Sequence, residues 1–294
     1  MKAQAYDLIG DIHGQHDKLM TVLRLLGYVQ IGGTYRHPEG RRVVFLGDYV
    51  DRGPKVREVL QTVKGMVDAG VAVALMGNHE YNVVCYHRPK AGGGWLRERS
   101  KANTRQIEAS LKAFAGREDE WAGWLQWMRQ LPLFLDLGEF RAVHACWDER
   151  NVQRIGSRNF LEDAFLQASA LEGTPEYEAV ENLLKGPEIR LPAGFQFADH
   201  EGQLRKTTRV RWWDIPDAAQ IRELTMRDAI EAEDAVDPDY LRNLPNYDRD
   251  EPPVFFGHYS MSTKRGVIPI RPNLACLDFG AGYDGPLVAY RWDG

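Results

Sequence analysis

The first third of the chain alternates short apolar runs with segments of helical periodicity. The apolar runs occupy residues 6–9, 43–46 and 71–76. Between them, residues 15–26 and 54–70 carry apolar side chains three and four positions apart, and each segment closes near a glycine, as an amphipathic helix does. Apolar strands that alternate with such helices predict an α/β fold in which a parallel sheet is covered on both faces.

The rest of the chain predicts further helices and strands around one irregular segment. Residues 102–114 and 118–129 have helical periodicity. The irregular segment spans about 157–250 and includes an expected hairpin around residues 199–202. We expect one domain over residues 1–294, with 157–250 as an insertion that lies over the site. The later strand-like runs are residues 134–137, 140–146, 254–256, 274–277 and 287–290.

Five short motifs that combine glycine with acidic, amide or imidazole side chains each follow an apolar run. They are Gly-Asp-Ile-His-Gly at 10–14, Gly-Asp-Tyr-Val-Asp-Arg-Gly at 47–53, Gly-Asn-His-Glu at 77–80, Val-His-Ala at 143–145 and Gly-His at 257–258. A lone histidine in an apolar run, such as His144, is usually a core residue. Because ligands gather at the carboxyl ends of strands in such sheets, the five motifs together predict a shared metal site. Oxygen and imidazole ligands without thiolates suit Mn²⁺, Fe or Zn²⁺ rather than a structural zinc site.

The five motifs resemble, in order, the signature motifs of the calcineurin-like metallophosphoesterases. The motifs at 47–53 and 77–80 are most similar to those of the phosphoprotein phosphatase branch. The resemblance implies an α/β/β/α sandwich with central mixed sheets and a helical and hairpin insertion near the site. It covers the motifs from Asp11 to His144 and resumes at Gly257, and it does not cover most of residues 157–250.

The resemblance also implies a pair of divalent cations, of which Mn²⁺ is the first expectation and Fe or Zn²⁺ the alternatives. Asp48 would bridge both cations. Many family members carry a further ligand histidine at the position of Ser260, and its absence here fits the phosphoprotein phosphatase branch. The six implied ligands are Asp11 and His13 for the first cation, Asn78, His144 and His258 for the second, and Asp48 for both.

The chemistry implied by the resemblance is hydrolysis of a phosphoester. Two cations about 3.5–4 Å apart can share a hydroxide that attacks phosphorus in line. His79 would protonate the leaving group, Asp51 would orient His79, and Arg52 would grip the phosphate. The alternative for Asp51 and Arg52 is a surface ion pair.

A second phosphate-binding arginine is expected within residues 208–214. The alternating pattern places Arg209 and Arg211 on one side of a strand, and either could serve. The alternative is that both arginines belong to a polar outer face.

The substrate is less specified than the reaction. Asp51 and Glu80 favour a Ser/Thr protein phosphatase-like phosphomonoesterase that acts on phosphoproteins or small phosphoesters. Residues 277–285 are instead similar to bacterial symmetrical diadenosine tetraphosphatases, so hydrolysis of a nucleoside polyphosphate is the alternative. They are also similar to the phosphatase module of bacterial RNA end-healing kinase-phosphatases. A non-catalytic scaffold would have eroded ligands, whereas all six ligand positions are suitably occupied.

Two further features allow a binding interpretation or a structural one. Residues 88–105 hold six Lys or Arg and one Glu, with three glycines at 92–94. This segment predicts a basic flap over a polyanion or, more simply, a solvated helix face with a flexible loop. Trp147, Trp212 and Trp213 could stack on a nucleobase, although core packing is the simpler expectation.

Composition excludes several other classes. A formal net charge of −5 gives no sign of a stable nucleic-acid partner or of membrane-surface binding. The three cysteines are widely spaced, which argues against a disulfide framework. No apolar run approaches the roughly 20 residues of a membrane span, and residues 1–10 lack the apolar core of a signal peptide. We therefore expect a cytoplasmic enzyme.

Overall fold

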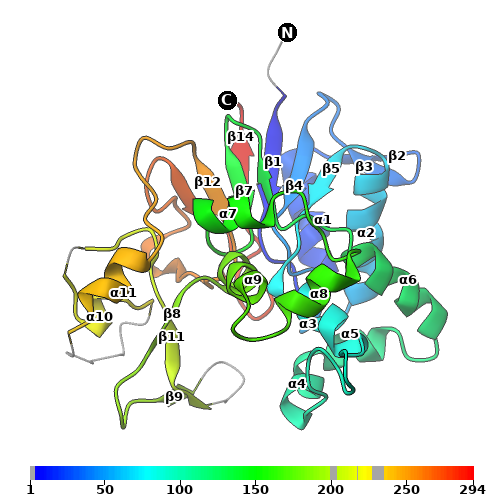
Figure 1. Ribbon diagram of the computed structural model, residues 1–294. Coiled ribbons are helices and arrows are strands. Elements are labelled where there is room, and N and C mark those ends of the chain that lie inside the picture. Colours follow the sequence, from blue (N-terminus) through cyan, green and yellow to red (C-terminus); the bar gives the residue numbers. More distant parts are fainter. Residues whose placement is uncertain (1–3, 199–203, 217, 227–234) are drawn as a thin grey trace.

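The computed structural model describes residues 4–198, 204–216, 218–226 and 235–294. Two four-stranded mixed sheets form its centre (Figure 1). The first has the order β14-β1-β4-β5, in which β1, β4 and β5 run parallel and β14 pairs antiparallel with β1. Its strands are β1 (Tyr6–Ile9), β4 (Arg42–Phe45), β5 (Ala72–Ala74) and β14 (Ala289–Trp292).

The second sheet has the order β13-β12-β7-β6. Here β7, β12 and β13 run parallel, and β6 pairs antiparallel with β7, where the sequence predicted two strand-like runs. Its strands are β6 (Phe134–Asp136), β7 (Arg141–Val143), β12 (Val254–Phe256) and β13 (Leu274–Cys276).

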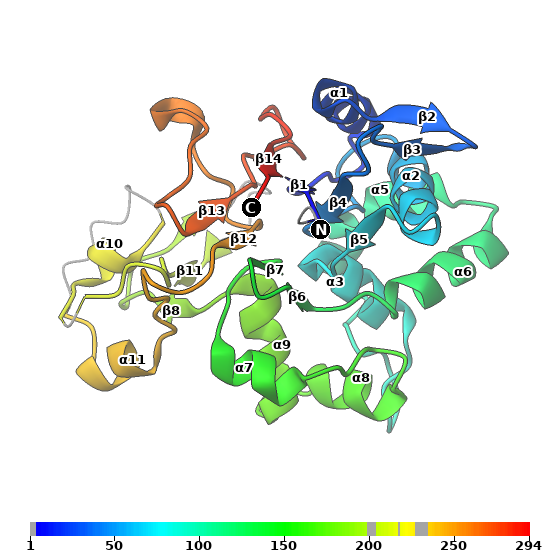
Figure 2. The ribbon, with the colours of Figure 1, turned by 90° about the horizontal axis from the view of Figure 1, so that it is seen from above.

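The two sheets pack face to face. Leu8 and Val44 of the first sheet lie in one buried apolar cluster with Ala142, Phe255 and Ala275 of the second. Helices cover the outer faces, as the view from above shows (Figure 2). The predicted α/β/β/α sandwich is therefore confirmed. The expected parallel sheet is covered on both faces, but by helices on one and by the second sheet on the other.

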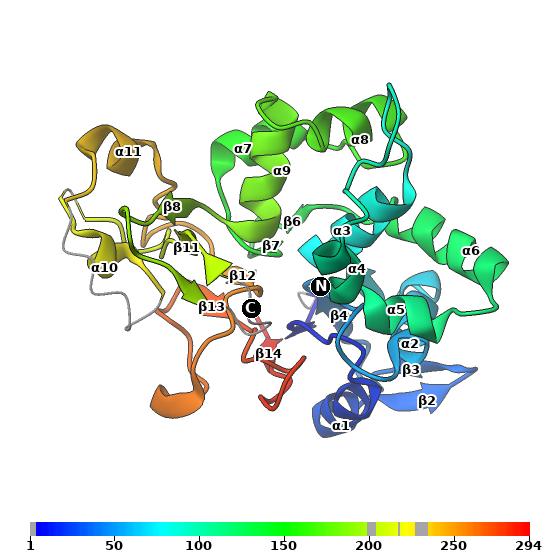
Figure 3. The ribbon, with the colours of Figure 1, turned by 90° about the horizontal axis from the view of Figure 1, so that it is seen from below.

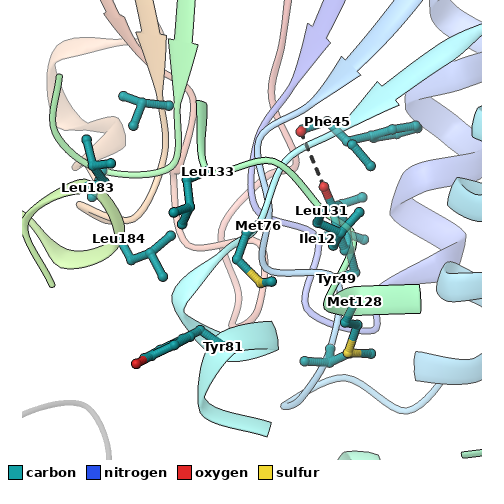
Figure 4. Packing of buried hydrophobic residues seen from close by; sticks show 14 of the residues in the cluster. Ile12, Phe45, Tyr49, Met76, Tyr81, Met128, Leu131, Leu133, Leu183 and Leu184 are labelled. Atoms are coloured by element: carbon teal, nitrogen blue, oxygen red, sulfur yellow. Dashed lines mark hydrogen bonds between the residues drawn. The ribbon is translucent and has the colours of Figure 1, made fainter. Parts of the chain in front are cut away.

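The larger apolar cluster lies between the sheets and the helices (Figure 4). Leu19 and Leu23 come from α1 (His16–Leu26), and Val59 and Val63 come from α2 (Val56–Asp68). Helix α1 ends at Gly27, whose φ of 92° is the left-handed conformation that favours glycine at this position. A short hairpin, β2 (Val29–Ile31) with β3 (Thr34–Arg36), follows α1 and was not predicted.

Two helices in the middle of the chain differ from the prediction. The helix expected over 102–114 is split at the buried Ile107 into α4 (Lys101–Gln106) and α5 (Glu108–Ala113). Helix α3 (Asn78–His87), which starts at the 77–80 motif, was missed. Residues 78–86 of this helix are all buried, so it has no polar face and no amphipathic pattern to recognise. The predicted helix at 118–129 is α6 (Glu118–Met128).

Residues 149–244 contribute to two different cores. Helices α7 (Glu149–Ile155), α8 (Asp163–Ser169) and α9 (Pro175–Lys185) pack on the main cluster through residues such as Leu166 and Leu183. Described residues between 189 and 244, such as Ile189 and Leu224, form a separate apolar cluster, whereas Trp212 and Trp213 pack on the main one. This part holds β8 (Glu188–Arg190), β9 (Phe197–Ala198), β10 (Leu204–Arg205), β11 (Thr207–Arg209), α10 (Ile221–Leu224) and α11 (Pro238–Asn243).

The hairpin expected around 199–202 falls mostly on residues outside the described ranges, although β9 and β10 on either side pair antiparallel. A single 3₁₀ turn, η1 (Thr263–Arg265), lies between β12 and β13. None of the helices in the described ranges has the length and apolar character of a membrane span.

Candidate metal centre

The predicted ligands gather where the strands end. His13 follows β1, Asp48 follows β4, Asn78 begins the helix after β5, and His144 and His258 follow β7 and β12. Helices α3, α4 and α9 and strand β11 lie around this edge of the sheets in the view from below (Figure 3). The strand order thus brings residues from five parts of the chain to one place.

Asp48 lies between two groups of side chains that could each hold a cation. Its Oδ2 is 3.4 Å from Nε2 of His13, and its Oδ1 is 3.4 Å from Nε2 of His144. One group is His13, Asp48 and His79, and the other is Asp48, His144 and His258; all of these residues are buried. A single carboxylate shared by two ligand groups suits a pair of neighbouring cations.

The histidine tautomers test whether cations fit this site. Nδ1 of His13 donates to the carbonyl oxygen of Val50 (3.1 Å), and Nδ1 of His144 donates to that of Leu46 (2.8 Å). In the neutral imidazoles each Nε2 therefore carries a lone pair near an Asp48 oxygen, although that of His13 also accepts an N–H of Arg52. Lone pairs that point at carboxylate oxygens repel each other unless a cation or a proton lies between them. The donor set therefore fits divalent cations.

Asn78 and Asp11 lie beside these groups, although Asp11 is a member of neither. Oδ1 of Asn78 lies 3.0 Å from Nε2 of His144 and 2.8 Å from Nδ1 of His258. Asp11 accepts the backbone N–H of His258 at 3.1 Å. Burial, and then the carboxylates of Asp278 and Asp48, raise the pKa of Asp11 well above its usual range. A cation beside these crowded carboxylates would offset that repulsion.

Glu80 organises the loop that carries Asp48. Its carboxylate is fully buried and accepts four backbone N–H groups, those of Asp48 (2.8 Å), Tyr49 (2.7 Å), Val50 (3.1 Å) and Gly77 (3.0 Å). In turn, Oδ1 of Asp48 accepts the N–H of His79 in the first turn of α3, at 3.0 Å. The Asp48 loop and the start of α3 therefore hold each other in place.

Backbone strain marks the same loops. Among the described residues, six that are not glycine have positive φ, and all lie in the motifs or within two residues of them. Such conformations cost about 1–3 kcal/mol each and persist where surrounding contacts enforce them, often at functional sites. The six residues are His13, Asp48, Asp51, Arg52, His258 and Ser260.

His79 and Asp51 form a buried pair beside the ligand groups. Nδ1 of His79 lies 2.7 Å from Oδ2 of Asp51, while the Ser110 hydroxyl donates to the other Asp51 oxygen and accepts the Asp51 N–H. Burial lowers the pKa of His79 to about 3 and raises the pKa of Asp51 to about 7. Burial therefore opposes the charged imidazolium that the resemblance implies, although the orienting contact is in place.

The three predicted phosphate-binding arginines are placed differently. Arg52 is exposed and donates to Nε2 of His13 (2.7 Å) and more weakly to Nε2 of His79 (3.4 Å). Arg209 is half-buried, and its guanidinium donates to the carbonyl oxygen of His258 at 2.7 Å. Strand β11 ends at Arg209, so the predicted alternation stops there. Arg211 donates to the carbonyl oxygen of Glu223 instead.

The basic segment is docked on neighbouring helices. Arg88 pairs with Asp163 at the start of α8 (2.6 Å), and Arg97 donates to Asn82 of α3 (2.7 Å). The backbone N–H of Ala91 donates to the side chain of Gln167 in α8. The loop is therefore fixed by specific contacts rather than simply solvated.

Of the two interpretations of the tryptophans, core packing is the one that the structure supports. Trp147, Trp212 and Trp213 are all buried in the main apolar cluster. Core packing, and not an exposed stacking surface, is what the structure shows for these three side chains.

The contacts of two residues at this site could not be inferred from the sequence. Ser110 lies on α5, far along the chain from the 47–53 motif, and nothing in its surroundings marks it. Glu80 belongs to the 77–80 motif, but the four backbone N–H groups that it accepts come together only in the folded chain. The glycines next to the ligands gave a clearer signal. A side chain at Gly257 would begin 2.0 Å from Oδ1 of Asp11, and one at Gly77 would begin 2.3 Å from Asp48.

Comparison with known proteins identifies the family of the chain. The family model described as calcineurin-like phosphoesterase matches residues 6–191, which is more than half of the chain. The chain belongs to the calcineurin-like phosphoesterases. The family comprises metal-dependent phosphoester hydrolases that use a dinuclear divalent metal centre.

Individual relatives of this phosphoesterase carry narrower names. A symmetrical bis(5′-nucleosyl)-tetraphosphatase of Ralstonia nicotianae is 28% identical over 96% of this chain and 87% of its own length. An asymmetrical bis(5′-nucleosyl)-tetraphosphatase of Halalkalibacterium halodurans is 46% identical, but over 25% of this chain and 30% of its own length. The chain therefore matches less than a third of the length of that relative.

Among solved structures, a cold-active protein tyrosine phosphatase matches the phosphoesterase with a TM-score of 0.51 at 19% identity. The match covers 97% of this chain and 73% of the other. At this identity the likeness concerns the fold alone.

Proposed function

We propose that this phosphoesterase hydrolyses phosphomonoesters of the kind that Ser/Thr protein phosphatases cleave, with His79 as the leaving-group acid. The observation that carries the proposal is the buried His79–Asp51 pair directly beside the two ligand groups that share Asp48. Departure of a serine or threonine alkoxide demands a proton, because the alkoxide is strongly basic. A positioned acid is of less use for a leaving group that is already weakly basic.

The two cations, Mn²⁺ in our proposal, would supply an activated water and neutralise charge on the phosphate. Asp11 and His13 would hold one cation, Asn78, His144 and His258 the other, and Asp48 both. Asp51 would fix the ring orientation of His79 so that Nε2 faces the departing oxygen.

Arg52 and Arg209 would bind the phosphate oxygens. Both guanidinium groups lie beside ligand histidines, Arg52 at His13 and Arg209 at the backbone of His258. A planar guanidinium is suited to two oxygens of one phosphate. Arg211 is the weaker candidate, since its guanidinium is directed to Glu223.

A second candidate is hydrolysis of a dinucleoside polyphosphate. It is favoured by the similarity along 96% of the chain to the symmetrical tetraphosphatase. The same residues would serve, but the bond broken would be an anhydride. The distinction lies in the leaving group, because a nucleoside diphosphate is a much weaker base than an alkoxide and needs less help from His79.

A substrate panel in added Mn²⁺ tests both candidates. We expect turnover of phosphoserine and phosphothreonine peptides to exceed that of diadenosine tetraphosphate and of 2′,3′-cyclic nucleotides. Faster hydrolysis of diadenosine tetraphosphate, with ADP as the only nucleotide product, would instead establish the second candidate. Absence of hydrolysis across the panel, with both cations bound, would count against the two together.

A further inference from the structure

The loop after β13 lies directly against two residues of the candidate site. A side chain at Gly282 would begin 2.8 Å from the ring of His13 and 2.9 Å from Cδ of Arg52, so only glycine allows this approach. The next residue, Tyr283, places its ring 4.6 Å from Cζ of Arg52. Residues 280–285, here called the Tyr283 loop, therefore border the guanidinium that would meet a substrate phosphate.

Lys18 of α1 holds this loop. Its ammonium donates to three carbonyl oxygens of the Tyr283 loop, those of Ala281 (2.8 Å), Tyr283 (3.0 Å) and Gly285 (2.8 Å). An ammonium has three N–H donors, and here each has a partner in the same short loop. A lysine that served only solubility would extend into water, whereas Lys18 is half-buried and fixes the shape of the loop.

Arg52 needs such support. It is exposed and has a left-handed backbone with φ of 61°. Its guanidinium donates to His13 and His79 and faces the ring of Tyr283. It forms no ion pair with a carboxylate of the described residues, although the charges of Asp11 and Asp51 lie near enough to interact with it. A long side chain that is free to move pays entropy when it binds a ligand, and a ring that restricts the guanidinium reduces that cost.

We propose that Lys18 and Tyr283 are positioning residues for Arg52. Lys18 fixes the Tyr283 loop, and the ring of Tyr283 holds the Arg52 guanidinium where it meets a phosphate oxygen. This inference rests on the phosphate-binding role of Arg52 given under Proposed function. Neither Lys18 nor Tyr283 touches the substrate in this arrangement, so their effect passes entirely through Arg52.

The test compares Lys18→Met, Tyr283→Leu and Tyr283→Phe in the Mn²⁺-loaded full chain, each alone and combined with Arg52→Ala. The measurements are kcat and KM on p-nitrophenyl phosphate, the inhibition constant of inorganic phosphate, and the melting temperature. Lys64→Met is the matched control, because Lys64 pairs with Asp68 of its own helix on an exposed face.

We expect Lys18→Met and Tyr283→Leu to raise KM and the phosphate inhibition constant by about 3- to 10-fold, with a smaller change in kcat. Tyr283→Phe retains the ring, so its KM and phosphate inhibition constant should rise less than those of Tyr283→Leu, whereas Lys64→Met should stay near wild type. In the Arg52→Ala background, Lys18→Met should add nothing, because the group it positions is already gone.

Three results would overturn the inference. One is an unchanged phosphate inhibition constant in both Lys18→Met and Tyr283→Leu. Another is an equal rise with and without Arg52, which would indicate a general structural effect. If Arg52→Ala alone leaves phosphate inhibition unchanged, the phosphate-binding role of Arg52 fails, and the inference fails with it.

Discussion

Two regions border the candidate site, and they are built differently. The strand-end loops that carry Asp48 and His258 are buried, adopt left-handed backbone conformations and have their N–H groups bound by carboxylates. Segment 188–244 contributes Arg209 but has its own small apolar cluster. The loops are therefore fixed by the main sheets, whereas Arg209 lies on a segment that has its own cluster and reaches the main cluster through Trp212 and Trp213. We expect changes in the loops to remove activity and changes in the segment to adjust it.

The largest effect should come from Asp48→Asn. Asp48 faces both ligand groups, so loss of one carboxylate weakens two cation sites together. We expect metal content to fall well below two per chain and kcat to fall by roughly 10³-fold or more. Elemental analysis after dialysis measures the first, and initial rates measure the second.

Asp17→Asn is the control for Asp48→Asn, since Asp17 is an exposed partner of Lys55. It should retain metal and activity. Two firmly bound cations in Asp48→Asn would show that the ligand groups do not depend on a shared carboxylate.

His79→Asn should have the next largest effect, without loss of metal. Removal of a positioned acid typically costs about 10²- to 10⁴-fold on a poor leaving group. We expect a fall of this size in kcat on an alkyl phosphomonoester, and a much smaller fall on p-nitrophenyl phosphate, whose leaving group needs little protonation. Parallel rate measurements on the two substrates provide the check.

The two substrates differ in how much protonation the leaving group needs, so together they distinguish an acid from a structural residue. Equal losses on both substrates would indicate that His79 binds a cation or stabilises the fold and does not donate a proton to the leaving group. That alternative has a basis in the geometry, because His79 lies in one of the two ligand groups.

Glu80→Gln should destabilise the loop rather than alter the chemistry. The amide that replaces the carboxylate would turn an NH₂ group toward backbone N–H donors, so at least one buried contact is lost. Loss of a buried hydrogen bond of this kind costs about 1–3 kcal/mol. The free energy of unfolding, from urea titration of the apo protein, should fall by that amount.

Glu108→Gln is the matched control for Glu80→Gln. Glu108 pairs with Lys112 on the exposed face of α5, where such pairs contribute about 0.5 kcal/mol or less. Equal stability of the two variants would contradict the role given to the four contacts of Glu80.

The contrast between local motifs and contacts made by distant segments also explains how much of the fold and site the sequence predicts. Motifs such as 10–14 and 47–53 are local, and each follows an apolar run, so their convergence at one sheet edge was predictable from strand order. The second sheet was implied by family resemblance alone, because β7, β12 and β13 are separated by long intervening segments. Helix α3 was missed because burial on all sides removes the periodic signal. Contacts such as Ser110 with Asp51 depend on packing that one sequence does not encode locally.

The smallest effect separates the two arginines of the insertion. The alternation of residues 208–214 treats Arg209 and Arg211 as equivalent, but β11 ends between them and directs one guanidinium to His258 and the other to Glu223. We expect Arg209→Ala to raise KM by about 3- to 10-fold and Arg211→Ala to stay within about 2-fold of wild type. Each variant is the other's control, since both remove the same side chain from the same segment. A larger effect at Arg211 would mean that segment 188–244 meets the substrate in an arrangement different from the one described, with Arg211 released from Glu223.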